Sequence, residues 1–223
     1  MTLLETNILT CPNCSKFVQV LEVLSFHIFE SEVYSDGKAD TTPIMPNTSR
    51  ILICPECNKE FWLEDAKNIL DNEIISDEIK DVATPTELFS VKNSDNLLGL
   101  SLYYKRLLDD QFAKTTDRES YLRILLWHEL NNIVRYNIPI RNEVLVQCDK
   151  MIFENLVQLV KIFNPVYLEE KLMLAEMYRE LGEFDFAIEI LKTIEDDYLN
   201  DRKEELLTAC KKKTTKVFKL KNN

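Results

Sequence analysis

Two short cysteine pairs constrain the fold of this 223-residue chain more than any other feature. They span Cys11–Cys14, with the letters CPNC, and Cys54–Cys57, with the letters CPEC. Each spacing places two thiolates about one tight turn apart, which a tetrahedral zinc ion accepts from a single loop. Together the pairs supply four sulfurs, which leaves no coordination position for water or substrate. We therefore predict a structural Zn²⁺ site whose ligands are Cys11, Cys14, Cys54 and Cys57.

Other chemistry is open to four cysteines. A redox dithiol is typical of one CxxC motif, but it does not explain why the chain has two. An iron–sulfur cluster also takes four cysteine ligands and stays an alternative. The chain begins without a secretory signal pattern, so we expect its six cysteines to stay reduced rather than to form disulfides.

The 39 residues between the two pairs favour β structure. Residues 17–34 are rich in Val, Leu, Ile and Phe, a composition typical of strands, and the letters SDG at 35–37 predict a turn. Residues 51–53 predict a short strand that leads into Cys54, and residues 61–63 predict a last strand. With its paired CPxC motifs, this region resembles a zinc ribbon. The resemblance implies a small antiparallel sheet over residues 1–66 that depends on its metal.

Such a module is too small to fold by burial alone. Zinc binding at thiolates contributes on the order of 10 kcal/mol of apparent folding free energy. We expect zinc removal to unfold the cysteine module and to leave the helices that follow largely intact.

From about residue 95 the apolar residues recur with the 3.6-residue period of helices. The pattern predicts helices over 95–112, from Thr116 to 136 and over 141–163, with a last helix over 200–220. Thr116 begins a capping-box pattern, because Glu119 follows three residues later. Before them, a short helix is predicted over 63–70, across the boundary with the cysteine module. Residues 67–94 predict a linker with short helices, one of which starts at Pro85.

One stretch in the helical part carries a second resemblance. Residues 172–191 read LMLAEMYRELGEFDFAIEIL, with small residues at Ala175 and Ala187 and a glycine at Gly182. The stretch resembles one tetratricopeptide repeat, a pair of antiparallel helices. Because one repeat cannot bury its own faces, the resemblance implies that the other helices form degenerate repeat-like pairs. The predicted class is thus α+β: a zinc ribbon (1–66), a linker (67–94) and an all-α, tetratricopeptide-like stack of helical hairpins (95–223).

Other reactive residues have ordinary explanations. His128 begins an HExxH-like motif, but Asn132 stands where the second histidine would be required. His27 is not needed as a ligand beside four thiolates. Cys148 and Cys210 lie on apolar helix stripes and are predicted to be buried core residues. We predict no catalytic residues, no second cofactor and no enzymatic activity.

Charge argues against a nucleic-acid partner. The net charge is −11, and residues 1–66 hold 4 Lys or Arg against 10 Asp or Glu, whereas nucleic-acid binding depends largely on cations that neutralise phosphates. The exception is the tail, residues 211–223, with six lysines and no acid; we interpret these lysines as favourable charges at a helix C-terminus. No apolar run reaches the roughly 18 residues of a membrane span, so we expect a soluble, cytoplasmic protein.

The predicted function is a non-enzymatic protein–protein interaction or scaffold protein with a structural zinc site. The alternative is a zinc-ribbon nucleic-acid-binding or regulatory protein that uses the basic tail. A zinc enzyme is disfavoured because four sulfurs leave no open metal position. The sequence points to no particular protein partner and to no oligomeric state.

Overall fold

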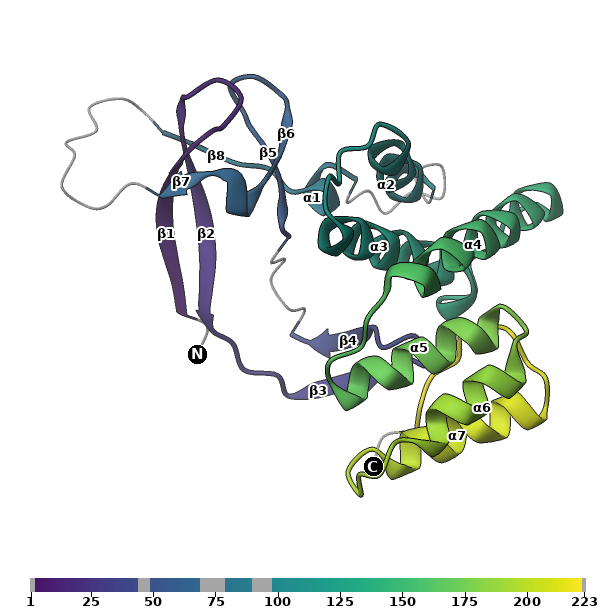
Figure 1. Ribbon diagram of the computed structural model, residues 1–223. Coiled ribbons are helices and arrows are strands. Elements are labelled where there is room, and N and C mark those ends of the chain that lie inside the picture. The colour runs from purple at the N-terminus through teal and green to yellow at the C-terminus, as the bar shows by residue number, and fades with distance from the viewer. Residues whose placement is uncertain (1–2, 44–48, 69–78, 90–97, 222–223) are drawn as a thin grey trace. The chain divides into compact units, whose positions relative to one another are not determined.

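The computed structural model describes residues 3–43, 49–68, 79–89 and 98–221. Small β-sheets come first and helices follow, so the predicted α+β class is confirmed (Figure 1). The chain divides into two compact units. Unit 1 comprises Met1–Glu30 and Thr41–Asn96, and unit 2 comprises Ser31–Asp40 and Leu97–Asn223. Thus ten residues from between the cysteine pairs group with the helices, whereas we expected residues 1–66 to form one module.

A four-stranded sheet with the order β7-β1-β2-β8 dominates unit 1. Its strands are β1 (Leu3–Thr10), β2 (Phe17–Ser25), β7 (Lys67–Asn68) and β8 (Lys80–Asp81). β1 and β2 are antiparallel, with Thr10 opposite Phe17, and β8 runs parallel to β2. Strand β1 was not predicted, because the polar residues in its middle interrupt the strand pattern. It forms because each of its residues pairs with one of β2.

The second cysteine pair lies between β5 (Ile51–Ile53) and β6 (Glu60–Trp62), which pair with each other. Both strands were predicted, and the structure confirms them. The predicted helix over 63–70 is only a 3₁₀ turn, Leu63–Asp65, because the chain then pairs with β1 as β7; residues 69–70 lie outside the described part. Helix α1 (Pro85–Phe89) begins at the predicted proline. Thr84 caps it through reciprocal hydrogen bonds with Glu87.

The first three helices of unit 2 lie close to the predicted ranges, and the described residues of this unit form six helices in all. They are α2 (Gly99–Asp109), α3 (Thr116–Arg135), α4 (Asn142–Ile162), α5 (Leu168–Glu180), α6 (Phe184–Lys192) and α7 (Asn200–Lys211). The cap of α3 is Thr115 rather than Thr116, because the Thr115 hydroxyl accepts the Arg118 N–H at 3.3 Å. None of the described helices combines the length and apolarity needed to cross a membrane.

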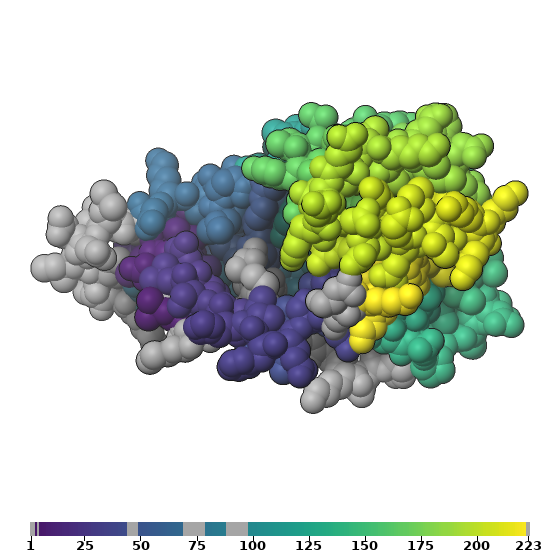
Figure 2. Space-filling view, turned by 90° about the horizontal axis from the view of Figure 1, so that it is seen from below, coloured from purple at the N-terminus to yellow at the C-terminus, as the bar shows by residue number. Residues whose placement is uncertain are grey.

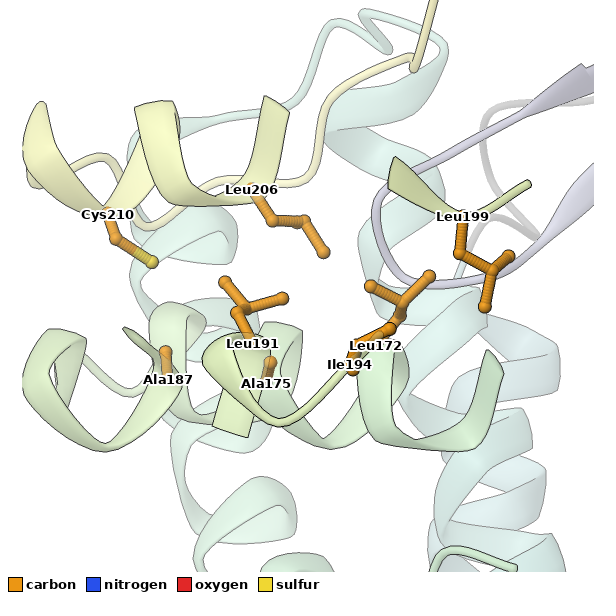
Figure 3. Packing of buried hydrophobic residues seen from close by; sticks show 8 residues of the cluster. All are labelled: Leu172, Ala175, Ala187, Leu191, Ile194, Leu199, Leu206 and Cys210. Carbon is orange, nitrogen blue, oxygen red and sulfur yellow. The ribbon is translucent and has the colours of Figure 1, made fainter. Parts of the chain in front are cut away.

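Helices α5, α6 and α7 share one apolar core, shown in Figure 3. Ala175 of α5 and Ala187 of α6 are both buried, and their small side chains let the two helices approach closely. Gly182 joins the two helices with a φ of +83°, which side chains rarely adopt. Leu206 and Cys210 of α7 complete the cluster.

The prediction of a last helix over 200–220 is wrong in its second half. Helix α7 ends at Lys211, and Lys213 has a left-handed φ of 53° that turns the chain away from the helix axis. Residues 214–220, which we call the C-terminal strap, then run non-helically, with Val217 and Leu220 buried. Figure 2 shows this C-terminal part of the chain in yellow at the surface.

The strap hydrogen-bonds to the segment that unit 2 takes from between the cysteine pairs. This segment, Ser31–Asp40, is the tip of the hairpin formed by β3 (Glu30–Val33) and β4 (Ala39–Thr42); we call it the hairpin tip. Its Ser35 N–H donates to the Phe218 carbonyl, and the Leu220 N–H donates to the Val33 carbonyl, both at 2.9 Å. Strap and hairpin tip therefore support each other although Ser35 and Phe218 are 183 residues apart in the sequence.

Candidate metal centre

The two cysteine pairs adopt the same backbone turn. In the first, the Ser15 N–H donates to the Cys11 carbonyl at 2.9 Å; in the second, the Asn58 N–H donates to the Cys54 carbonyl at the same distance. Ser15 and Asn58 both have left-handed φ values, 58° and 55°. Non-glycine residues adopt this conformation rarely, at a cost of roughly 1–2 kcal/mol each. Its occurrence at the equivalent position of both loops indicates that each loop is shaped around its two sulfurs.

The four sulfurs meet at one point. Cys14 Sγ lies 3.7 Å from Cys54 Sγ, and Cys11 Sγ lies 4.0 Å from Cys57 Sγ. All four sulfurs lie within 4.8 Å of one another. With metal–sulfur bonds of about 2.3 Å, tetrahedral geometry places sulfurs roughly 3.8 Å apart. Cys11, Cys14, Cys54 and Cys57 could therefore hold one metal ion, as the sequence spacing suggested.

Two of the cysteine thiols have pKa values shifted in opposite directions. Burial raises the pKa of the Cys54 thiol from 9.0 to about 12, against the opposing effect of backbone N–H groups. The pKa of the Cys14 thiol is lowered, chiefly because the backbone N–H of Lys16 donates to its sulfur. A buried thiol with a raised pKa is a poor anion by itself, whereas a cation among the four sulfurs would favour the thiolate. The donor set therefore fits a thiophilic cation.

Cysteine sulfurs form part of the core of unit 1. Cys11 and Cys54 are fully buried with Leu9, Val18, Leu52 and Phe61, and Cys14 and Cys57 pack at the edge of this cluster. Asn13 ties the first loop to β6, because its Nδ2 donates to the Glu60 carbonyl at 3.1 Å. The described part of this core is small, so an ion that joins the four cysteines would join most of its elements.

The remaining reactive residues are not members of the four-cysteine group. His27 is exposed. His128 Nε2 lies 3.0 Å from the Asp36 carbonyl, and burial lowers the pKa of its imidazole, which favours a neutral ring that donates there. Cys148 and Cys210 are 1% and 2% exposed, so their predicted place in the helical core is confirmed.

Two of the tail lysines form ion pairs in unit 2. Lys219 Nζ contacts Glu32 of the hairpin tip at 2.5 Å, and Lys216 Nζ contacts Asp149 of α4 at 2.6 Å. Both pairs are about half exposed. These lysines are thus not at a helix C-terminus, where the predicted helix to residue 220 would have placed them.

Sequence reasoning missed the buried polar groups of unit 2. Asp36 pairs with Arg135, and Glu176 pairs with Arg179; all four side chains are fully buried. Arg179 also donates to the carbonyls of Thr214 and Lys216 in the strap. Glu176 and Arg179 stand three residues apart on a helix, a spacing that signals a pair in the sequence. Asp36 and Arg135 are 99 residues apart, and no local pattern connects them.

Comparison with known proteins adds no family to these observations. No protein-family model matches the chain, and no curated protein or solved structure is significantly similar to it. The functional argument therefore depends on the site and on the fold alone.

Proposed function

We propose that the four cysteines hold a structural zinc ion and that unit 1 is a zinc ribbon. The observation that carries the proposal is the convergence of four sulfurs within 4.8 Å from two loops of equal backbone geometry. Four protein sulfurs fill a tetrahedral zinc ion, so the ion would stabilise the fold rather than bind a substrate. Their place in the core of unit 1 supports the structural role.

Metal analysis of the purified chain tests this assignment. We expect one zinc per chain, and Co²⁺ substitution should give the absorption bands of tetrahedral thiolate coordination. Cys54→Ser should lower the metal content, whereas Cys148→Ser, which changes a buried cysteine of α4, should leave it unchanged. Iron in place of zinc would support the iron–sulfur alternative instead, and full metal content in Cys54→Ser would exclude the four-cysteine site.

For the whole chain we propose a non-enzymatic interaction or scaffold function. The α5–α6 pair supports a tetratricopeptide-like unit through buried Ala175 and Ala187 and the turn at Gly182. In such stacks the inner helix faces bind peptides. Here Arg179 of α5 already hydrogen-bonds to the strap of its own chain. A protein partner is therefore expected to bind another surface.

Unit 1 offers one such surface on the β1–β2 ribbon. The strand register places Phe17 and Leu21 on the face opposite buried Val18, and these two side chains are 38% and 56% exposed. Half-buried Ile8 and Val23 lie on the same face. Exposed apolar side chains that share one face are a common feature of protein interaction sites. The exposed apolar residues of this face therefore support the proposal that a protein partner binds there.

The interaction function is tested by affinity capture with variants of equal stability. Phe17→Lys with Leu21→Lys should lose partners, whereas Val166→Lys with Tyr198→Lys, which changes two exposed residues of unit 2, should keep them. Identical partner sets for wild type and the ribbon variant would reject the ribbon face. If the bound material were nucleic acid, with affinity that falls steeply as salt rises, the nucleic-acid alternative would replace this proposal.

A further inference from the structure

The hairpin tip links the candidate metal site to the helices through the covalent chain. It lies between Cys14 and Cys54 in the sequence, so any ion held by the four cysteines closes the loop that contains it. Yet residues 31–40 group with unit 2 rather than with the cysteines. Tyr34, Ser35 and Asp36 are all less than one tenth exposed there.

Within unit 2 the tip supplies a charge that the helices need. The Asp36 carboxylate accepts hydrogen bonds from Arg135 and from Asn131, both on α3. The Arg135 side chain is fully buried. Burial of an unpaired guanidinium is strongly unfavourable, so this cation depends on the carboxylate that the tip delivers.

The tip also completes a polar network between α3 and α5. Asn131 Nδ2 donates to Asp36 at 3.1 Å and to the Glu180 carboxyl at 3.0 Å. Trp127 Nε1 donates to the other Glu180 oxygen at 2.9 Å. If Asp36 left, Asn131 would lose one acceptor and His128 would lose the backbone carbonyl that it contacts. Arg135, Asn131 and His128 of α3 would therefore each lose a partner if the tip undocked.

We propose that metal binding by the four cysteines stabilises the helical unit, because it holds both ends of the loop that presents Asp36. The inference rests on the proposed metal site, and it revises the expectation that the helices are indifferent to zinc. An isolated two-stranded hairpin is only marginally stable. With unit 1 folded, the Phe29 N–H donates to the Thr42 carbonyl at 2.9 Å, which closes the base of this hairpin. Without the metal, unit 1 loses order and the free loop loses more entropy when its tip docks.

Hydrogen exchange on the full chain, read by mass spectrometry, tests the coupling. Zinc-loaded protein is compared with protein treated with a chelator, and the amides of α3 are followed beside those of β1 and β2. We expect exchange of the α3 amides near Arg135 to rise about tenfold or more on zinc removal, since the tip then docks less favourably. If β1 and β2 lose protection while α3 exchanges at an unchanged rate, the coupling is wrong.

Variants show whether the effect passes through the tip. Asp36→Asn should already raise α3 exchange in zinc-loaded protein, and zinc removal should then add less than about threefold, because the two changes act on one interaction. Glu32→Gln, on the same hairpin but about half exposed, should respond to zinc as the wild type does. If Asp36→Asn does not fold, Gly37→Ala weakens docking with the charges intact, because its Cβ would lie 3.0 Å from Met173 Cγ. An undiminished zinc response in a tip variant that folds would overturn the proposal.

Metal content is measured on the same samples. A chain that binds no zinc would refute the proposed function itself. A chain that binds zinc and loses only unit 1 on chelation would refute the coupling alone. The two failures are therefore distinguishable.

Discussion

Unit 1 and unit 2 of this protein bury different chemistry at their centres. In unit 1, two cysteines are fully buried with four apolar residues in the described core. In unit 2, apolar side chains of several helices surround two ion pairs whose side chains are completely buried. The described apolar cluster of unit 1 includes all four cysteines, whereas the buried contacts of unit 2 involve helices, hairpin tip and strap.

The two units also differ in how far apart in the sequence their hydrogen-bonded residues lie. Each cysteine loop is shaped by hydrogen bonds that span four or five residues, such as Cys11 N–H to the Lys16 carbonyl. Unit 2 depends on contacts between its extremes, such as Ser35 with Phe218. A unit built from such contacts is stable only when distant segments are all present, since closing long loops costs entropy before any contact forms.

The sharpest test of the comparison removes one sulfur. Cys54→Ser should lose most of the metal-dependent stability, on the order of 10 kcal/mol in apparent terms, and unfold unit 1. Limited proteolysis with mass spectrometry should then find new cleavages in β1 and β2. Cys148→Ser is the matched control and should leave β1 and β2 resistant. Resistant strands in the Cys54 variant would mean that the apolar core suffices without the ion.

The next test removes the carboxylate of the hairpin tip. Asp36→Asn leaves Arg135 buried without its counter-charge and should lower the free energy of unfolding of unit 2 by about 3–5 kcal/mol, measured in urea. Glu32→Gln on the same hairpin breaks an ion pair that is about half exposed and screened by solvent, so its effect on stability should be much smaller. Equal losses would show that burial of the Asp36 pair is not decisive.

The strap can be tested with a neighbouring pair of residues. Leu220 is 5% exposed, and Leu220→Ala should lower stability by about 2–3 kcal/mol through lost burial and a residual cavity. Lys219→Ala removes only the half-exposed partner of Glu32 and should lower stability much less than Leu220→Ala does. Thermal unfolding of both variants gives the comparison. If Leu220→Ala leaves the unfolding temperature unchanged, the strap does not contribute to stability.

Two glycines have the same φ of +83°, but an added Cβ would meet a neighbouring side chain at only one of them. Alanine at each position therefore distinguishes the cost of backbone strain from the cost of a close contact. Gly182→Ala places its Cβ in open space, so its expected cost is only the backbone strain of about 1–2 kcal/mol. Gly37→Ala adds a contact of 3.0 Å with Met173, and because Met is flexible the extra cost should be about 0.5–1 kcal/mol. Urea unfolding measures both. A smaller loss at Gly37 than at Gly182 would contradict close packing of the tip.

The last test is a pH dependence. Burial raises the pKa of the Glu180 carboxyl well above 4.5, and the nearby Glu176 charge adds to the rise. The folded state therefore holds a proton that the unfolded state has lost above about pH 4.5, so this group's contribution to stability declines as pH rises towards its folded pKa. Urea unfolding at pH 5, 6 and 7 should show this decline in the wild type relative to Glu180→Gln. If the stabilities of wild type and Glu180→Gln change in parallel with pH, then Glu180 is ionised in the folded state.

Much of the local structure could be predicted from the sequence. The cysteine spacing identified the four residues that converge, and apolar periodicity located α2, α3 and α4 to within a few residues. Pro85 and Gly182 marked a helix start and a tight turn correctly. These features follow from interactions within a few residues of one another, which composition and spacing record directly.

The tertiary structure alone decided where the hairpin tip and the strap go. The letters SDG predicted the turn at Asp36, but its buried partner is Arg135, 99 residues away. The lysine-rich end continued a plausible helix pattern, yet it leaves that helix because Val217 and Leu220 are buried and Arg179 binds the backbone carbonyls of Thr214 and Lys216. Pairings of this kind depend on which distant surfaces meet, and a buried charge is stable only where its partner arrives. The periodicity of one segment carries no information about which distant segment packs against it.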